Sequence, residues 1–180
     1  MLSGIQKRII QAIVNAFETG TALGDYGNVT LIPGDEGHLT YGRSQTTLGS
    51  GNLFILIDRY CAAPGCQFGA QLSPFLQRVK NQDFSLDNNQ TFRSLLQQAG
   101  KDPVMIATQD RFFDDVYFKP ALNICQTMGI TTALGHAAVY DSCVHGSFEM
   151  IRDTTNANRG TIGVLGENAW VKAYLETRKA

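Results

Sequence analysis

Two acidic features of the sequence could do chemistry together. Glu18 ends a mostly apolar segment, and Asp35 stands beside Glu36 in a turn bracketed by Gly34 and Gly37. A carboxyl group among apolar neighbours tends to have a raised pKa, which suits a general acid, whereas a turn carboxylate in contact with water stays ionised and suits a general base. Two carboxyl groups in contrasting environments are what glycoside hydrolysis requires. The alternative is a solvated Glu at a helix end and an Asp that serves only its turn.

The segment before Glu18 predicts an amphipathic helix over residues 3–18. Apolar side chains recur there at helical spacing and form one broad stripe: Ile5, Ile9, Ile10, Ile13, Val14 and Phe17. Such a stripe is typical of a helix that packs on a core. Gly20 can stop this helix, which places Glu18 at its C-terminal end, where the helix dipole disfavours a negative charge.

Residues 25–48 are rich in glycine and differ from the rest of the chain. The segments 28–32 and 38–41 predict two short strands, which the turn at 33–37 connects. We therefore expect a small antiparallel sheet within a single domain that spans residues 1–180. The fold class that follows is α+β, mainly α.

The remaining sequence returns to helical patterns. The expected helices cover 51–61, 70–81, 89–99, 103–128, 131–145, 147–155 and 166–178, with a loop at 156–161. The segment 131–145 is apolar nearly all round, which predicts a central buried helix. Asp141 and His145 lie on it at the spacing i and i+4, so their side chains share one face.

Composition and charge exclude several classes of protein. The chain has 180 residues, of which 43% are hydrophobic and 17% are charged, as in an ordinary globular domain. The net charge of −1 and the scattered basic residues give no electrostatic footprint for nucleic acid. The longest apolar runs, such as 53–57, are too short to cross a bilayer. We therefore expect no nucleic-acid partner and no membrane association.

No cofactor or metal is expected either. The sequence lacks the glycine patterns of dinucleotide-binding and phosphate-binding loops, and it has no cluster of metal ligands. His38, His136 and His145 are spread along the chain, and each reads first as a structural histidine.

The cysteines and the first residues leave alternatives open. Cys61 and Cys66 enclose a four-residue turn, so a small disulfide loop and two free thiols are equally compatible with the sequence. Cys125 and Cys143 lie in apolar, helix-like surroundings, which favours buried free thiols. The first residues lack the apolar stretch and cleavage site of a signal peptide, which is compatible with an intracellular chain and with a mature or excised domain.

The spacing of Glu18, Asp35 and Thr40 resembles the chitosanases of glycoside hydrolase family 46. In that family a Glu ends the first long helix, an Asp follows in a β-turn, and a Thr comes five residues after that Asp. Three later blocks also resemble the family and occur in the same order: 109–121, 134–146 and 170–178. The resemblance implies a lysozyme-like, two-lobed and mainly helical fold with a cleft between the lobes.

The resemblance also implies an inverting endo-hydrolase that cleaves the β-1,4 linkages of chitosan. Glu18 would protonate the glycosidic oxygen, Asp35 would activate a water molecule, and Thr40 would hold that water. Glu36 competes with Asp35 for the role of base, and the spacing to Thr40 favours Asp35. We expect a monomer that is secreted, or acts in the periplasm, on a polysaccharide substrate, either chitosan or another amino-sugar polymer.

Three further residues take possible roles from the same resemblance. Asp141 and Arg178 look like members of the family's buried charge network, which positions the acid, although a purely structural ion pair is compatible with the same residues. His145 resembles a histidine that lines the cleft.

Two positions depart from the family pattern. Asn52 stands where the family has an Asp that binds the ammonium group of glucosamine, and an amide offers no charge to a cation. Arg43 would suit a polymer that carries carboxylates, or would serve as a surface residue that caps the small sheet. These two residues, with the missing signal-peptide pattern, motivate an alternative function: a peptidoglycan-cleaving muramidase or lysozyme-like lytic enzyme or toxin. A non-catalytic carbohydrate-binding relative is disfavoured because Glu18, Asp35 and Thr40 are all present.

Overall fold

The computed structural model describes residues 2–20, 24–43 and 46–179, except for the side chains of Glu18 and Thr19. The chain divides into two compact units, which we treat separately. The helical unit comprises residues 1–14 and 114–180, and the sheet-containing unit comprises residues 15–113. The first helix, α1 (Gly4–Thr19), begins in the helical unit and ends in the sheet-containing unit.

The sheet-containing unit holds three short antiparallel strands in the order β1–β2–β3. They are β1 (Val29–Thr30), β2 (Thr40–Tyr41) and β3 (Thr46–Thr47). In the middle strand, Thr40 pairs with Thr30 on one side and with Thr47 on the other. The register therefore fixes Thr40 in the centre of the sheet.

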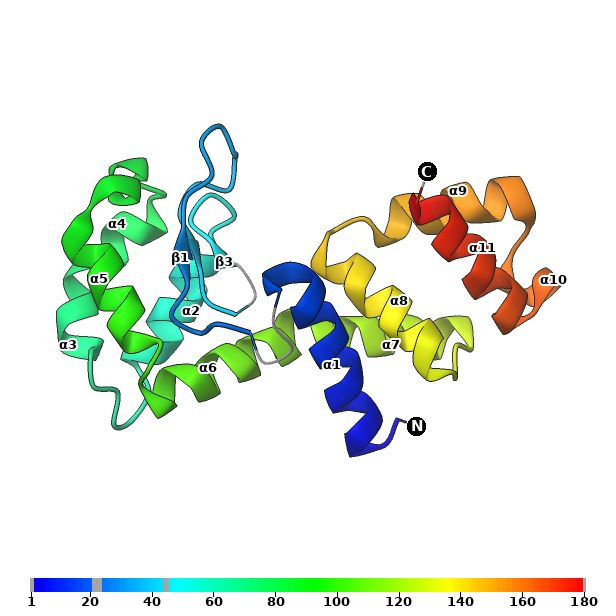
Figure 1. Cartoon of the computed structure of the whole chain (residues 1–180), viewed down its shortest axis with the longest axis horizontal. Helices are drawn as coiled ribbons and strands as arrows, with labels where there is room; N and C mark the ends of the chain where they lie inside the picture. Colours follow the sequence, from blue (N-terminus) through cyan, green and yellow to red (C-terminus); the bar gives the residue numbers. More distant parts are fainter. Residues whose placement is uncertain (1, 21–23, 44–45, 180) are drawn as a thin grey trace. The chain divides into compact units, whose positions relative to one another are not determined.

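The unit also contains helical segments. They are α2 (Asn52–Cys61), α3 (Gly69–Leu72), η1 (Ser73–Phe75), α4 (Leu76–Lys80), η2 (Phe84–Asn88), α5 (Gln90–Ala99) and α6 (Pro103–Phe113). Helix α2 contacts β3 and α5 contacts β1, so these helices lie along the sheet (Figure 1). The spacing of Leu53, Leu56, Ile57 and Tyr60 puts four fully buried side chains on one face of α2. This face supplies much of the core of the unit.

The helical unit is built from antiparallel helix pairs. Its elements after α1 are η3 (Asp114–Phe118), α7 (Lys119–Met128), α8 (Ala133–Val144), α9 (Phe148–Arg159), α10 (Ile162–Leu165) and α11 (Glu167–Lys179). Helix α7 packs on α8, and α9 packs on α11 (Figure 1). Trp170 and Tyr174 of α11 are fully buried and stack with their ring centroids 5.1 Å apart. In α8, Leu134 is the one exposed residue and the middle of the helix is buried, as predicted.

A carboxylate ties α11 to the start of α8. Both oxygens of Glu167 accept hydrogen bonds from the backbone and hydroxyl groups of Thr131 and Thr132, at 2.6–3.0 Å. Burial alone would raise the pKa of Glu167, but these hydrogen bonds outweigh it and lower the pKa to about 2.

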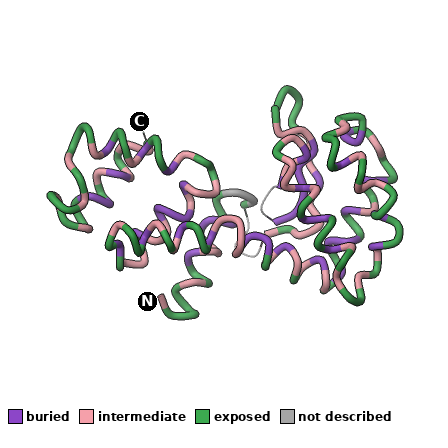
Figure 2. The backbone as a smooth tube through the Cα atoms, turned by 180° about the vertical axis from the view of Figure 1, so that it is seen from behind, coloured by how far each residue is buried: buried purple, intermediate pink, exposed green. Residues whose placement is uncertain are grey.

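Only part of the predicted stripe on α1 is buried. Ile10 and Val14 are almost inaccessible to solvent, whereas four apolar side chains of the stripe are exposed: Ile5, Ile9, Ile13 and Phe17. Figure 2 shows that much of the first helix, next to the N-terminus, is exposed. Asp114 of η3 accepts hydrogen bonds from Lys7 Nζ at 2.5 Å and from Gln11 Nε2 at 2.7 Å. Lys7 and Gln11 share a helix face with Ile10 and Val14, so this mixed face packs inward instead of the most apolar one.

The secondary-structure predictions were wrong at three places, and three elements were missed, one of which is α10 (Ile162–Leu165). The predicted helix 70–81 is interrupted by the 3₁₀ turn η1, because Pro74 there has no backbone N–H to donate. The predicted helix 103–128 is interrupted by the π-helical turn η3. The predicted loop at 156–161 is partly helical, since α9 continues to Arg159. Strand β3 and the 3₁₀ helix η2 were not predicted.

The cysteines are free thiols. Cys61 and Cys66 do not form the small disulfide loop, and the Cys66 thiol instead donates to the carbonyl oxygen of Cys61 at 3.6 Å. Cys125 is buried, as predicted, whereas Cys143 is only half-buried. Burial raises the pKa of Cys125 to about 12 and that of Cys143 to about 11. In the described ranges, no helix has the length and apolar character needed to span a membrane.

Candidate active site

Asp35 lies in the exposed turn between β1 and β2, where the glycine spacing predicts a turn. The backbone N–H of Asp35 donates to the carbonyl oxygen of Ile32 at 3.1 Å, and its own carbonyl accepts from His38 N at 3.1 Å. Its side-chain Oδ1 accepts from Gly37 N at 3.2 Å, which closes a local turn around the carboxylate. Gly34 adopts a φ of +83°, a left-handed conformation that favours glycine. The carboxylate of Asp35 is therefore exposed, while its backbone is well fixed.

Thr40 follows in the buried middle strand. Its residue is 6% exposed, and its Oγ1 donates to the carbonyl oxygen of His38 at 3.2 Å. The oxygen lone pairs of this hydroxyl remain able to accept a further hydrogen bond. Asp35 and Thr40 thus lie at the two ends of one short, hydrogen-bonded segment.

The neighbouring loop packs closely on this segment. Gly49 N donates to the carbonyl oxygen of Gly37 at 3.0 Å, and Leu48 N donates to that of Leu39 at 2.8 Å. A Cβ atom at position 49 would lie 2.4 Å from the carbonyl oxygen of Glu36, so only glycine fits there. The Glu36 side chain is exposed, like that of Asp35, so exposure alone does not distinguish the two candidates for the base.

Arg43 lies directly beyond β2, and it is 7% exposed. Its guanidinium pairs with Asp110 and donates to Tyr26 Oη and to Asn15 Oδ1, each at 3.4 Å. Its carbon Cζ lies 5.8 Å from the centroid of the Phe113 ring. Burial would lower the pKa of Arg43, but Tyr26 and Asp110 outweigh it and raise the pKa. Arg43 is therefore not a surface residue, and its internal contacts favour a structural role over direct contact with a substrate.

The last turn of α1 carries Glu18. The helix ends at Thr19, and Gly20, with a φ of +72°, donates its N–H to the carbonyl oxygen of Ala16 at 3.0 Å. This confirms that Gly20 ends the helix and that Glu18 is in its last turn. The side chain of Glu18 is outside the described part of the chain. Asn15, one turn earlier, is 5% exposed and receives the hydrogen bond from Arg43, which ties this turn of α1 to the end of β2.

Asn52 is the first residue of α2, in the same unit as Asp35 and Thr40. Its backbone N–H donates to Ser50 Oγ at 3.3 Å, and its side chain is half-buried. Gly51 before it has a φ of +77°. Asn52 is thus fixed at the junction between the β3 loop and α2.

The helical unit contains the predicted charge pair. Arg178 Nη2 lies 2.5 Å from Asp141 Oδ2, and Arg178 Nη1 donates to Ser142 Oγ at 2.7 Å. His145 Nε2 lies 3.7 Å from Asp141 Oδ1, on the next turn of α8, and the histidine side chain is 45% exposed. The sequence therefore identified residues that do come together, and the structure shows them as an ion pair with a neighbouring histidine.

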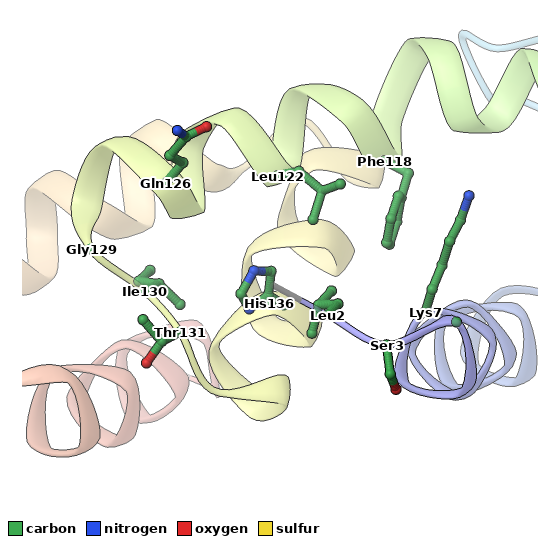
Figure 3. A pocket seen from close by; sticks show the side chains of 11 residues that line it. Leu2, Ser3, Lys7, Phe118, Leu122, Gln126, Gly129, Ile130, Thr131 and His136 are labelled. Atoms are coloured by element: carbon green, nitrogen blue, oxygen red, sulfur yellow. The ribbon is translucent and has the colours of Figure 1, made fainter.

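A pocket of about 540 Å³ also lies in the helical unit. Its lining includes Leu2, Lys7, Phe118, Ile130 and His136 (Figure 3). The described lining is mostly apolar and contains no carboxylate, so this pocket lacks the groups that glycoside hydrolysis requires. Among the described residues, no three His, Cys, Asp or Glu side chains are grouped so that they could hold a metal ion.

One anchoring residue escaped sequence analysis. Asp87 of η2 is buried and bonds to His38 and Leu39, within the segment that joins Asp35 to Thr40. In the sequence, an Asp followed by Asn88 and Asn89 looks like an ordinary turn residue, so nothing marked Asp87 as part of a site. The one available signal was His38 itself, a bulky residue in a glycine-rich turn.

Comparison with protein families gives the class of the chain. Residues 12–180 match glycosyl hydrolase family 46. Since this match covers most of the sequence, the chain belongs to glycosyl hydrolase family 46. The resemblance seen in the spacing of Glu18, Asp35 and Thr40 is thereby confirmed at the level of the family.

Two relatives are similar over most of the chain. A chitosanase of Bacillus subtilis is 28% identical over 183 residues, covering 96% of this chain and 66% of the relative. A chitosanase of Streptomyces sp. is 31% identical over 140 residues, covering 73% of this chain and 50% of the relative. This chain thus spans about two thirds of the length of the Bacillus subtilis relative and half of the length of the Streptomyces relative.

Solved structures share the fold. A GH46 chitosanase of Gynuella sunshinyii, in complex with chitotetraose, has a TM-score of 0.85 at 27% identity. A mutant chitosanase of Bacillus subtilis MY002, in complex with six GlcN, has a TM-score of 0.83 at 28% identity. Each match covers 99% of this chain and 78% of the other. The predicted fold class, mainly helical with a small antiparallel sheet, is confirmed.

Proposed function

We propose that this chain is an inverting endo-hydrolase of chitosan that cleaves the β-1,4 linkages of the glucosamine polymer. The observation that carries the proposal is the fixed segment from Asp35 to Thr40, which pairs an exposed carboxylate with a buried hydroxyl. Family membership supports it, as do two relatives named chitosanases and two solved relatives in complex with chitotetraose or GlcN.

The proposed reaction is a single displacement. Glu18 gives its proton to the glycosidic oxygen as the bond from that oxygen to the anomeric carbon breaks. Asp35 takes a proton from a water molecule, whose oxygen forms the new bond to the same carbon from the opposite face of the sugar. This route requires the two carboxyl groups to stand at least about 6.5 Å apart, so that the water fits. Thr40 would hold the water through the free lone pairs of its hydroxyl.

Asp35 remains the proposed base, with Glu36 as its competitor. The turn geometry supports Asp35, because its carboxylate is held by Gly37 N in the same segment that ends at Thr40. A base must lie within hydrogen-bond reach of the water that it activates, and a carboxylate with a fixed backbone keeps that reach.

The substrate assignment depends on Asn52 and Arg43. Burial of Arg43 removes one of the reasons for a peptidoglycan substrate, because a 7% exposed guanidinium held by internal contacts is poorly placed to bind a polymer. Asn52 still lacks the charge that would attract an ammonium group. We therefore propose chitosan as the substrate, with weaker discrimination between amine and acetamide groups at the sugar that Asn52 would contact.

Further roles remain predictions. We propose a monomer that acts outside the cell or in the periplasm, with residues 1–180 acting as one catalytic domain. The Asp141–Arg178 pair and His145 are proposed to support the acid and the substrate, as the family resemblance implies.

The test is reducing-end release from chitosan and from purified peptidoglycan, measured side by side. We expect products from chitosan only, and proton NMR at early times should show the α-anomer from the β-linked polymer, since one displacement inverts the anomeric carbon. Products from peptidoglycan alone would replace the proposal with a muramidase. A first product of β-configuration would exclude the inverting route.

A further inference from the structure

The segment that joins Asp35 to Thr40 accepts contacts from a buried carboxylate of a different element, which holds it in place through hydrogen bonds. Asp87 belongs to η2 and is 7% exposed. Its Oδ1 accepts a hydrogen bond from the backbone N–H of Leu39 at 2.9 Å, and its Oδ2 lies 2.8 Å from His38 Nδ1. The two oxygens of one side chain thus hold two consecutive residues, which directly precede Thr40 in the chain.

His38 is the second residue of this segment that η2 holds. Its backbone has a φ of +57°, and only one other described residue with a side chain, Gln82, has a positive φ. This conformation is unfavourable for residues with a Cβ atom, and it persists where the surrounding structure fixes it. Here the imidazole ring stacks on Phe84, also in η2, with the ring centroids 3.5 Å apart and the planes 7° from parallel. Helix η2 therefore holds His38 through both a hydrogen bond and a ring contact.

We propose that Asp87 is a positioning residue, which acts with His38 to set where Asp35 and Thr40 stand relative to the attacking water. The inference rests on the proposed function, in which Asp35 and Thr40 handle that water. A glycine-rich turn by itself samples many conformations. Anchoring it to η2 selects one of them, and a displacement of about 1 Å at a reacting group can cost about 100-fold in rate.

The test compares two buried carboxylates of the same unit. Asp87→Asn keeps the size of the side chain but removes the charge that His38 Nδ1 faces. Asp102→Asn is the matched control, because Asp102 is 2% exposed and also binds backbone N–H groups, those of Gln67 and Val104. We expect Asp87→Asn to lower kcat on chitosan about 10- to 100-fold with KM within about twofold. Asp102→Asn should lower the Tm but keep kcat within about twofold in the folded protein.

A double-mutant cycle separates positioning from general stability. If Asp87 acts through the base, Asp87→Asn lowers kcat in the parent protein but has little further effect once Asp35 is replaced by Asn. An equal loss in both backgrounds, or an equal loss of kcat in the Asp102→Asn control, would overturn the inference. Full activity of Asp35→Asn would overturn the proposed base instead, and the inference with it.

A second variant keeps the test decisive if Asp87→Asn does not fold. His38→Ala removes the ring from Phe84 and from Asp87 but leaves the Leu39 hydrogen bond to Asp87 in place. We expect a smaller loss of kcat, about 3- to 10-fold, that also disappears in the Asp35→Asn background. A folded His38→Ala protein with the parent kcat would overturn the inference.

Discussion

Replacing Thr40 by Val removes one hydroxyl from the centre of the sheet and changes the shape of the side chain little. The hydroxyl makes one hydrogen bond within the protein, at 3.2 Å to the carbonyl oxygen of His38. Its loss should cost about 0.5–1.5 kcal/mol of unfolding free energy. If Thr40 also holds the attacking water, the loss of that contact should lower kcat about 100-fold, which corresponds to about 2.7 kcal/mol. The effect on catalysis should therefore exceed the effect on stability.

Thr46→Val is the matched control for this change. Thr46 lies in β3 of the same sheet and is 5% exposed, close to the 6% of Thr40. Urea unfolding measures the stability of both variants, and initial rates of reducing-end release from chitosan measure kcat. We expect both variants to fold, with a loss of stability of at most about 1.5 kcal/mol in either. A loss of kcat should occur in Thr40→Val alone. An unchanged kcat in folded Thr40→Val, or equal losses in both variants, would refute the assignment of the water to Thr40.

Asp35→Asn should lower the rate of chitosan cleavage to below about 1% of the parent rate, whereas Glu36→Gln should keep it within about threefold of that rate. The reverse pattern in the same assay would make Glu36 the base. Glu167→Gln should lower the unfolding free energy by about 1–2 kcal/mol at pH 7, a value discounted for partial exposure. Folding lowers the pKa of Glu167 from 4.5 to about 2, so its contribution to stability is complete above about pH 5 and disappears as the pH falls towards 2. Denaturant unfolding of both proteins at several pH values measures this difference, and a difference that does not change with pH would contradict the prediction. Arg43→Met should lower the unfolding free energy by about 1–3 kcal/mol, because it removes the hydrogen bonds of a buried guanidinium while Asp110, which is 48% exposed, can be solvated. A folded variant of parent stability with a raised KM would instead indicate that Arg43 binds substrate.

The sequence predicted where the proposed catalytic residues lie better than it predicted the residues that hold them in place. Glycine spacing placed Asp35 in a turn between two strands, and Gly20 placed Glu18 in the last turn of α1, because glycine in these conformations has a local physical cause. The Asp141–Arg178 pair was also found, through its family pattern. By contrast, Asp87 and His38 are 49 residues apart, and nothing local to either marks the contact.

The predictions for α1 and Arg43 were wrong because contacts between distant residues, rather than the local sequence pattern, determine which side chains are buried. The apolar stripe of α1 suggested that its most hydrophobic face is buried, yet Asp114 draws in the face that carries Lys7 and Gln11. Arg43 could be read from the sequence only as a surface or substrate-facing residue. Its burial depends on Asp110, far along the chain, and such tertiary pairing leaves no local signal.

Glu18 and Asp35 are proposed to form the acid–base pair of a chitosan hydrolase. The most direct measurement is the initial rate of reducing-end release from chitosan for the parent protein and for Glu18→Gln, with folding checked by circular dichroism. We expect ready cleavage by the parent and a loss of at least about 1000-fold in the variant, since Gln cannot donate the proton that the leaving oxygen needs. Undiminished cleavage of chitosan by folded Glu18→Gln would contradict the claim.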